Sequence, residues 1–184
     1  MGKGVIVFGA SGSGTTTLAK ELALLLGFTH IDVDDYFWRW DTEVPYSVPR
    51  QREERIERLM NDIGNITGFV MSGSICGWDE AFIPFFRLAV FVTTPAEVRV
   101  QRLKAREFDE FGKRIQIGGD MYDNHQSFLE WASEYDTMEP PNRSFKLHEQ
   151  WAAKLPCTVL RTSGMTPAEE NAAQIAEKYK DIIR

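Results

Sequence analysis

Short apolar runs alternate with helical patterns along this chain of 184 residues. Runs such as 88–92 are apolar without interruption, which is typical of strands buried on both faces of a parallel sheet. Apolar residues at helical spacing lie between the runs, and alternating strands and helices predict a mostly parallel α/β fold. The predicted strands are 5–8, 30–33, 69–72, 88–92 and 158–161, and the predicted helices are 16–26, 50–63, 95–106 and a last one opening at 166–169.

Residues 107–155 do not follow this alternation. The segment contains Gly118-Gly119 and Pro140-Pro141, several aromatic residues and mixed charges, but no convincing strand. We therefore predict one domain over residues 1–184, with a helical insertion at about 107–155. Long excursions of this kind are often lids, and a rigid structural subdomain is the alternative. In the helix before the insertion, Thr94 is the predicted N-cap.

Composition and charge narrow the class of function. The formal net charge is −6, which disfavours general binding to nucleic acid. Two cysteines and three scattered histidines form no zinc pattern. The first apolar run is too short for a signal peptide or a membrane span. We expect a cytoplasmic protein with no membrane or nucleic-acid partner, and the sequence leaves open whether it is a monomer or a homodimer.

A glycine-rich turn between the first strand and the first helix carries the main chemical signal. Its glycines let successive N–H groups point inward, and the helix N-terminus adds free N–H groups and a positive dipole end. The pattern matches G-x-x-x-x-G-K-[ST], except that Thr15 replaces the lysine, and Thr16 stands where a hydroxyl ligates Mg²⁺. The segment reads Gly9, Ala10, Ser11, Gly12, Ser13, Gly14, Thr15, Thr16, Thr17.

This turn predicts binding of ATP with Mg²⁺, and a purely structural turn is the alternative. A dinucleotide fingerprint G-x-G-x-x-G fits less well, because Ser11 or Thr17 falls where a glycine is required. Asp32 does lie near the distance expected of a ribose-binding acid, so an NAD-dependent enzyme is a weaker alternative.

With these motifs, the sequence resembles the adenylate kinase, cytidylate kinase and shikimate kinase group of P-loop kinases. The turn followed by Thr-Thr is similar to that of archaeal cytidylate kinases, which also lack the lysine. The resemblance follows the order of elements over nearly the whole chain. It implies a three-layer P-loop fold with a five-stranded parallel sheet in the order 2-3-1-4-5, a substrate region and a mobile lid.

The resemblance also implies roles for residues that follow the second and third strands. In shikimate and gluconate kinases an Asp-x-Asp here serves magnesium and substrate, which points to Asp32 for metal and substrate and Asp34 for catalysis. An extended segment would place both carboxylates on one side; a solvated loop or a helix N-cap is the alternative. Ser72 and Gly73 correspond to a turn against the phosphate acceptor, unless they form an ordinary strand-to-loop turn.

Arginines are the remaining candidates. Arg99, Arg102 and Arg106 share one face of the predicted fourth helix, and in related kinases such arginines clamp the transferred phosphoryl group or stack on adenine. Arg102 and Arg106 are the predicted catalytic cations, and a solvated basic face is the alternative. Arg114 of the insertion and Arg50 are predicted substrate contacts. Arg102, Arg106 and Arg114 are the cations that can replace the missing lysine.

The sequence thus predicts an ATP-dependent phosphotransferase that acts on a small acceptor. A nucleoside monophosphate is the first choice of acceptor, and the hydroxyl of a small metabolite is the second. With a hydroxyl acceptor, Asp34 is the expected proton acceptor. The absent lysine leaves a different class open, a nucleotide-binding module with little catalysis that acts as a ligand sensor.

Overall fold

The computed structural model describes residues 4–78 and 80–183. One sheet contains five parallel strands in the order β2-β3-β1-β4-β5, as the resemblance to P-loop kinases implies. The second strand ends one residue earlier than predicted, because Asp32 begins a short helix. The strands are β1 (Gly4–Gly9), β2 (Thr29–Asp32), β3 (Phe69–Ser72), β4 (Phe86–Thr93) and β5 (Thr158–Ser163).

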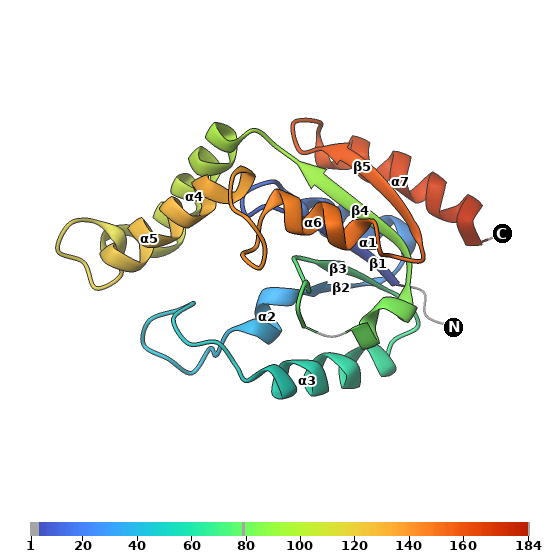
Figure 1. Ribbon diagram of the computed structural model, residues 1–184, viewed down its shortest axis with the longest axis horizontal. Coiled ribbons are helices and arrows are strands. Elements are labelled where there is room, and N and C mark those ends of the chain that lie inside the picture. Colours follow the sequence, from blue (N-terminus) through green and yellow to red (C-terminus); the bar gives the residue numbers. More distant parts are fainter. Residues whose placement is uncertain (1–3, 79, 184) are drawn as a thin grey trace.

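Helices cover both faces of the sheet and give three layers (Figure 1). Alternate residues of β1 face opposite layers, because successive side chains of a strand point to opposite sides. Val5 and Val7 pack in the layer of α1 and α7, while Ile6 and Phe8 pack in the layer of α3 and α6. The covering helices are α1 (Thr15–Leu26), α3 (Arg52–Gly64), α6 (Phe145–Ala152) and α7 (Ala168–Ile183), and α2 is Val33–Phe37.

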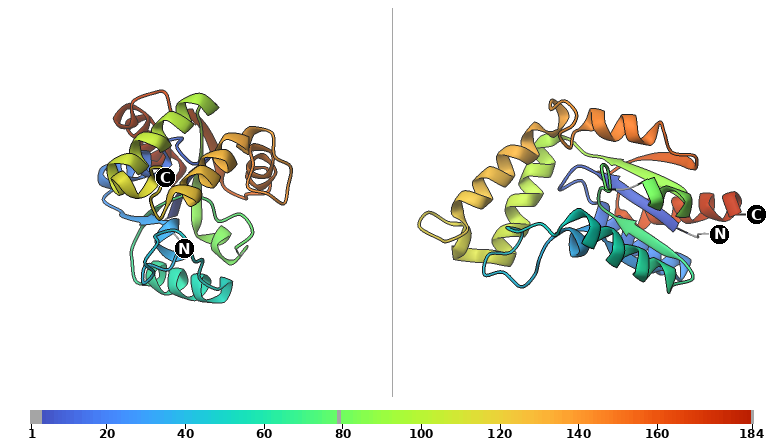
Figure 2. Two further views of the ribbon diagram at one scale, coloured as in Figure 1. Left: turned by 90° about the vertical axis from the view of Figure 1, so that its left-hand side faces the viewer. Right: turned by 60° about the horizontal axis from the view of Figure 1, so that its bottom comes forward.

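Residues 107–155 are helical, as predicted, but they divide into two parts. α6 packs on the sheet, whereas the part before it joins α4 in an arm that projects from the sheet (Figure 2). Leu103 of α4 and Leu129 and Ala132 of α5 form a small core of their own where the two helices pack together. No strand lies within 107–155, all of which the structure describes. The arm contains α4 (Ala96–Phe111), η2 (Gly112–Ile115), α5 (Tyr122–Ser133) and η3 (Glu134–Asp136); η1 (Glu80–Phe85) precedes β4. Movement of the arm as a lid stays a prediction.

The predicted cap of the fourth helix is wrong. Pro95 occupies the N-cap position of α4 and makes no side-chain capping bond. The Thr94 hydroxyl instead donates to the carbonyl of Ser13 at 3.2 Å, and Thr94 is 8% exposed. Thr94 therefore supports the glycine-rich turn from behind. Within the described part of the chain, no helix is long and apolar enough to cross a membrane.

Candidate active site

The glycine-rich turn is closed by hydrogen bonds within itself. The Ala10 carbonyl accepts both the backbone N–H of Ser13, at 3.1 Å, and the Ser13 hydroxyl, at 2.6 Å. Gly12 and Gly14 have φ of 79° and 93°, which favours glycine. The first helical bond of α1 runs from the N–H of Leu18 to the carbonyl of Gly14. The N–H groups of residues 15–17 precede that bond and are left for an anion.

Two oxygen ligands meet beside this turn. The Thr16 hydroxyl donates to Oδ2 of Asp32 at 3.3 Å, so the first turn of α1 and the end of β2 place both oxygens together. Hydroxyl and carboxylate oxygens suit Mg²⁺, which takes its other ligands from phosphates and water. No group of three or more His, Cys, Asp or Glu side chains that could hold a metal occurs among residues 4–78 and 80–183. The pair therefore fits a metal brought in with a nucleotide, and it contains the two predicted metal ligands.

The predicted extended Asp32–Asp34 segment is wrong. Oδ1 of Asp32 accepts the N–H of Asp34 at 3.1 Å and caps α2, so helix formation wins over the extended form. Asp34 nevertheless keeps solvent contact and lies near two cations. Desolvation raises the pKa of Asp34, and the Asp32 carboxylate raises it further, while Arg143 and Arg106 lower it. A carboxyl of this kind is suited to accept a proton.

Asp35, the next residue, belongs to different surroundings. It lines a cavity of about 580 Å³ along the outer edge of β2, together with Lys20, His30 and Tyr36. Desolvation and the Asp32 carboxylate raise the pKa of Asp35, and His30 and Lys20 lower it. Neighbouring carboxyls on α2 thus have different sets of cations around them.

The three arginines of α4 are not equivalent. Arg99 is fully buried and donates to the carbonyls of Thr94 and Ala132 and to the carboxylate of Asp136. It therefore holds α4 to η3 and α5. The expectation that Arg99 shares a phosphate-binding face with Arg102 and Arg106 is wrong. Arg102 is exposed and donates to the carbonyl of Gly164, and its Nη1 lies 3.9 Å from where a Cβ on Gly14 would stand.

Arg106 lies further along α4, is exposed, and acts on Asp34 by its charge. The predicted catalytic residues Asp34 and Arg106 are thus brought near each other, and Arg102 is brought to the glycine-rich turn. Their roles in catalysis stay predictions.

Sequence reasoning missed one cation, Arg143. Its Nη2 donates to the carbonyl of Gly9 at 3.0 Å, although 134 positions separate the two residues. The available signal was its position directly before Ser144, whose hydroxyl accepts the N–H of Leu147 and caps α6.

The hydroxyls of Ser72, at the end of β3, and of Ser74, in the turn after it, are both hydrogen-bonded to histidines. Ser72 is fully buried and bonds His30 at 3.0 Å, which leaves its hydroxyl no solvent contact. Gly73 allows a close approach to Val33, because a Cβ there would stand 2.9 Å from the Val33 Cβ.

His148 of α6 belongs to a second, separate set of hydrogen bonds. Its Nε2 lies 2.9 Å from the Ser74 hydroxyl, and its Nδ1 lies 2.6 Å from the hydroxyl of Tyr135. Burial, and then the charge of Arg143, lowers the pKa of His148 to about 3. The imidazole is therefore neutral near pH 7 and bridges the turn after β3 to the arm.

Arg50 and Arg114, the other predicted substrate contacts, lie away from the glycine-rich turn. Arg50 pairs with Glu54 at 3.2 Å, and its Nε is buried without a partner. Arg114 pairs with Asp120 and donates to the carbonyl of Glu43, so it joins the arm to the loop at 38–51. Contact of either arginine with a substrate stays a prediction.

Aromatic rings meet at the same junction of arm and loop. Tyr46 contacts Trp38 and Trp40 in its own loop and Phe111 of the arm, with centroid separations of 5.0–6.3 Å. Tyr46 has φ of 57°, a conformation that is uncommon for a residue other than glycine. The arm is thus held against the loop by rings as well as by Arg114.

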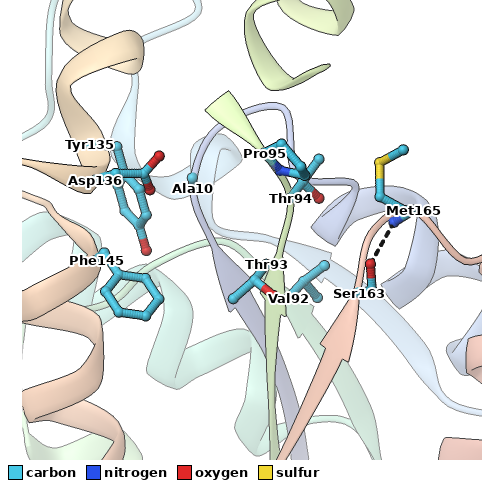
Figure 3. A pocket seen from close by; sticks show the side chains of 10 residues that line it. All are labelled: Ala10, Val92, Thr93, Thr94, Pro95, Tyr135, Asp136, Phe145, Ser163 and Met165. Atoms are coloured by element: carbon cyan, nitrogen blue, oxygen red, sulfur yellow. Dashed lines mark hydrogen bonds between the residues drawn. The ribbon is translucent and has the colours of Figure 1, made fainter. Parts of the chain in front are cut away.

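A cavity of about 340 Å³ adjoins the glycine-rich turn at Ala10 (Figure 3). Thr94 and Pro95 lie at the end of β4, and Tyr135 and Asp136 face them from η3. The Arg99–Asp136 ion pair thus borders this cavity. The space beside the turn is therefore built by the same contacts that fix the arm.

Comparison with known proteins agrees with this geometry. A family model described as an AAA domain matches residues 5–129, which include the glycine-rich turn, Asp32, Asp34 and most of the arm. The chain belongs to this family of P-loop proteins. It is also 36% identical over 177 residues to the uncharacterized protein YqaC of Bacillus subtilis (strain 168), covering 96% of this chain and 97% of YqaC.

Kinases are among the further relatives. The chain is 29% identical over 112 residues to a cytidylate kinase of Thermococcus sibiricus, covering 56% of each protein. Shikimate kinase from Acinetobacter baumannii, solved in complex with shikimate, has the same fold, with a TM-score of 0.56 and 17% identity over 98% of this chain and 94% of that one. A shikimate kinase of Bacteroides thetaiotaomicron gives a TM-score of 0.55 at 16% identity, covering 97% and 98%. The chain is therefore a P-loop protein that has the fold of shikimate kinases and is similar in part of its sequence to cytidylate kinases.

Proposed function

We propose that the protein transfers the γ-phosphoryl group of ATP to a hydroxyl group of a small acceptor. The observation that carries the proposal is the Asp34 carboxyl, which keeps solvent contact beside two arginines. Asp34 is linked to the phosphate-binding turn by two successive hydrogen bonds, from its own N–H to Asp32 and from the Thr16 hydroxyl to Asp32. A proton acceptor and a phosphate site are thus parts of one structure.

The position of Asp34 favours a hydroxyl over a phosphate as acceptor. An alcohol must lose a proton as it attacks phosphorus, and the raised pKa of Asp34 makes its carboxylate a better base for that step. A phosphate acceptor needs no base. A carboxylate 4 Å from a phosphate charge would add repulsion of about 4 kcal/mol at an effective dielectric constant of 20.

The steps follow from the positions of the groups. The N–H groups of the turn and of the first turn of α1 bind the β- and γ-phosphates, and Thr16 and Asp32 would hold Mg²⁺, which offsets phosphate charge. An acceptor oxygen bonds to the γ-phosphorus while the bridging P–O bond breaks and its electrons pass to ADP. The acceptor proton moves to Asp34, and Arg106 stabilises charge on the transferred group.

A nucleoside monophosphate is the second candidate acceptor. The cytidylate kinases among the curated relatives support it. So does the presence of Arg106 and Arg143 around Asp34, since two cations can hold an acceptor phosphate.

The experiment is a measurement of ADP formation from Mg·ATP against a panel of small alcohols, sugars and nucleoside monophosphates. Asp34→Asn should lower kcat with the best hydroxyl acceptor by about 10²–10⁴-fold, because the base is lost. Asp35→Asn, the matched change one residue away, should leave kcat within about twofold.

Each alternative gives its own result. Retained activity of Asp34→Asn with monophosphates and none with alcohols would favour the nucleoside-monophosphate reaction. Tight binding of ATP without turnover on any acceptor would favour a ligand sensor and contradict the proposal.

A further inference from the structure

The phosphate-binding turn has Thr15 at the position of the usual lysine, so another group must supply its charge. The candidate cations differ in what they already bind. Arg99 and Arg114 are committed to Asp136 and Asp120 in ion pairs. Arg102 lies beside Gly14, at the end of the turn that leads into α1.

Arg143 lies at the opposite end of the turn, where β1 runs into it. Its Nη2 bonds the carbonyl of Gly9, the first glycine of the phosphate-binding pattern. Among the described residues it forms no ion pair, and its Nε is buried with no hydrogen-bond partner. A half-buried guanidinium group with a buried, unused donor and no ion-pair partner is costly unless an anion binds there.

The geometry places the guanidinium group of Arg143 at the start of the phosphate-binding turn. Its Nη2 bonds the carbonyl of Gly9, the last residue of β1. A phosphate held by the N–H groups that follow Gly9 would therefore lie within reach of this cation.

Rigid placement distinguishes Arg143 from Arg106. Arg106 is exposed on α4, whereas Arg143 is half-buried and its guanidinium group lies 5.8 Å from the ring centre of Trp131. The capped start of α6 at Ser144 fixes the backbone next to it. A cation that is already in place needs no reorganisation as charge develops on the phosphoryl group.

We propose that Arg143 replaces the lysine of the phosphate-binding turn and binds the γ-phosphate of ATP. This inference rests on the proposed phosphotransferase function and names a cation for the same site. During transfer the guanidinium group stays protonated and only stabilises negative charge on the γ-phosphoryl oxygens. It takes no part in the exchange of bonds or of the acceptor proton.

The test compares nucleotide binding and turnover in a small set of variants of the full chain. Isothermal titration with Mg·ATP and Mg·ADP should show that Arg143→Ala weakens ATP binding about tenfold more than ADP binding. Arg143→Gln keeps a donor for the Gly9 carbonyl but has no charge, and it should also weaken ATP binding more than ADP binding. Because it keeps that hydrogen bond, it shows whether the loss in Arg143→Ala comes from a folding defect. Lys146→Ala removes a nearby cation that pairs with Glu139 and should change neither affinity.

A second-site change supplies a readout that a structural role would not give. Arg143→Ala should lower kcat by about 10²–10³-fold, and adding Thr15→Lys to it should recover at least tenfold. Equal losses for ATP and ADP, or no recovery by Thr15→Lys, would overturn the inference. If the wild type binds ATP but phosphorylates no acceptor, the proposed function fails, while the difference between ATP and ADP still decides the role of Arg143.

Discussion

Replacing Gly12 by alanine should damage the phosphate-binding turn far more than the same change at Gly14. Both residues have positive φ, which costs a residue with a Cβ about 1–2 kcal/mol. At Gly12 the added Cβ would stand 2.6 Å from the carbonyl oxygen of Arg99, whereas at Gly14 the nearest atom is 3.9 Å away. The two variants thus share the backbone cost and differ in the clash.

The clash at Gly12 cannot be relieved cheaply. The opposing atom belongs to the backbone of α4, and the Arg99 side chain is fixed by bonds to Thr94, Ala132 and Asp136. Forcing an extra carbon into a packed site costs typically 1–3 kcal/mol. Gly12→Ala should therefore lower the free energy of unfolding by about 2–5 kcal/mol, against about 1–2 kcal/mol for Gly14→Ala.

Urea unfolding measures the loss of stability, and titration with Mg·ADP measures the turn itself. Each kcal/mol corresponds to about 2–4 °C in Tm for a chain of this size. Gly12→Ala should also weaken Mg·ADP binding more than Gly14→Ala does. Equal losses of stability in the two variants would show that contact between the turn and α4 does not hold the turn in shape.

Three further predictions concern the support around the site. Arg99→Met should lower the free energy of unfolding by about 3–5 kcal/mol, because two carbonyls and Asp136 lose a buried partner. Arg102→Met should lower it by less than about 1 kcal/mol. Similar losses for both variants in urea titrations would contradict a structural role of Arg99. Burial lowers the pKa of His148 to about 3, below its unfolded value near 6.5. Between these values the unfolded chain binds more protons, so the free energy of unfolding falls as pH falls. Between pH 7 and pH 5 the wild type should lose about 2 kcal/mol more than His148→Gln, and equal losses in the two proteins would refute this. Arg114→Ala should speed hydrogen exchange at 112–121 and in the loop at 38–51, and unchanged exchange would show that the arm is held by other contacts.

The sheet was predictable because its signal is local. Unbroken apolar runs such as 88–92 mark central strands, and the glycine-rich turn marks the end of β1. The motif of the turn predicted Thr16 as a metal ligand, and the resemblance to shikimate and gluconate kinases implied Asp32. The structure brings these two oxygens together.

Other features depend on contacts between distant segments. Arg99, Arg102 and Arg106 looked alike by spacing, and only packing against α5 and η3 shows that Arg99 is buried. Leu103, four residues after Arg99 and also fully buried, was the local sign of that face. Arg143 reaches Gly9 across 134 positions, so no periodicity in the sequence could pair them.

After β2 the sequence favoured an extended segment and left a helix N-cap as the alternative, which is the form that the structure has. Five residues carry little helical signal, and the capping bond from the N–H of Asp34 to Asp32 decides their conformation. The shift from an extended segment to a helix gives Asp34 and Asp35 different surroundings, which is the basis of the matched pair of variants at these positions.

The central claim is that the backbone N–H groups between β1 and α1 bind a nucleotide phosphate chain. NMR spectra of the ¹⁵N-labelled protein titrated with Mg·ADP test it directly. We predict that the amide chemical shifts of residues 11–17 change most, and that Mg-pyrophosphate alone produces smaller changes at the same amides. Unchanged amides at 11–17 in the presence of millimolar Mg·ADP would contradict it.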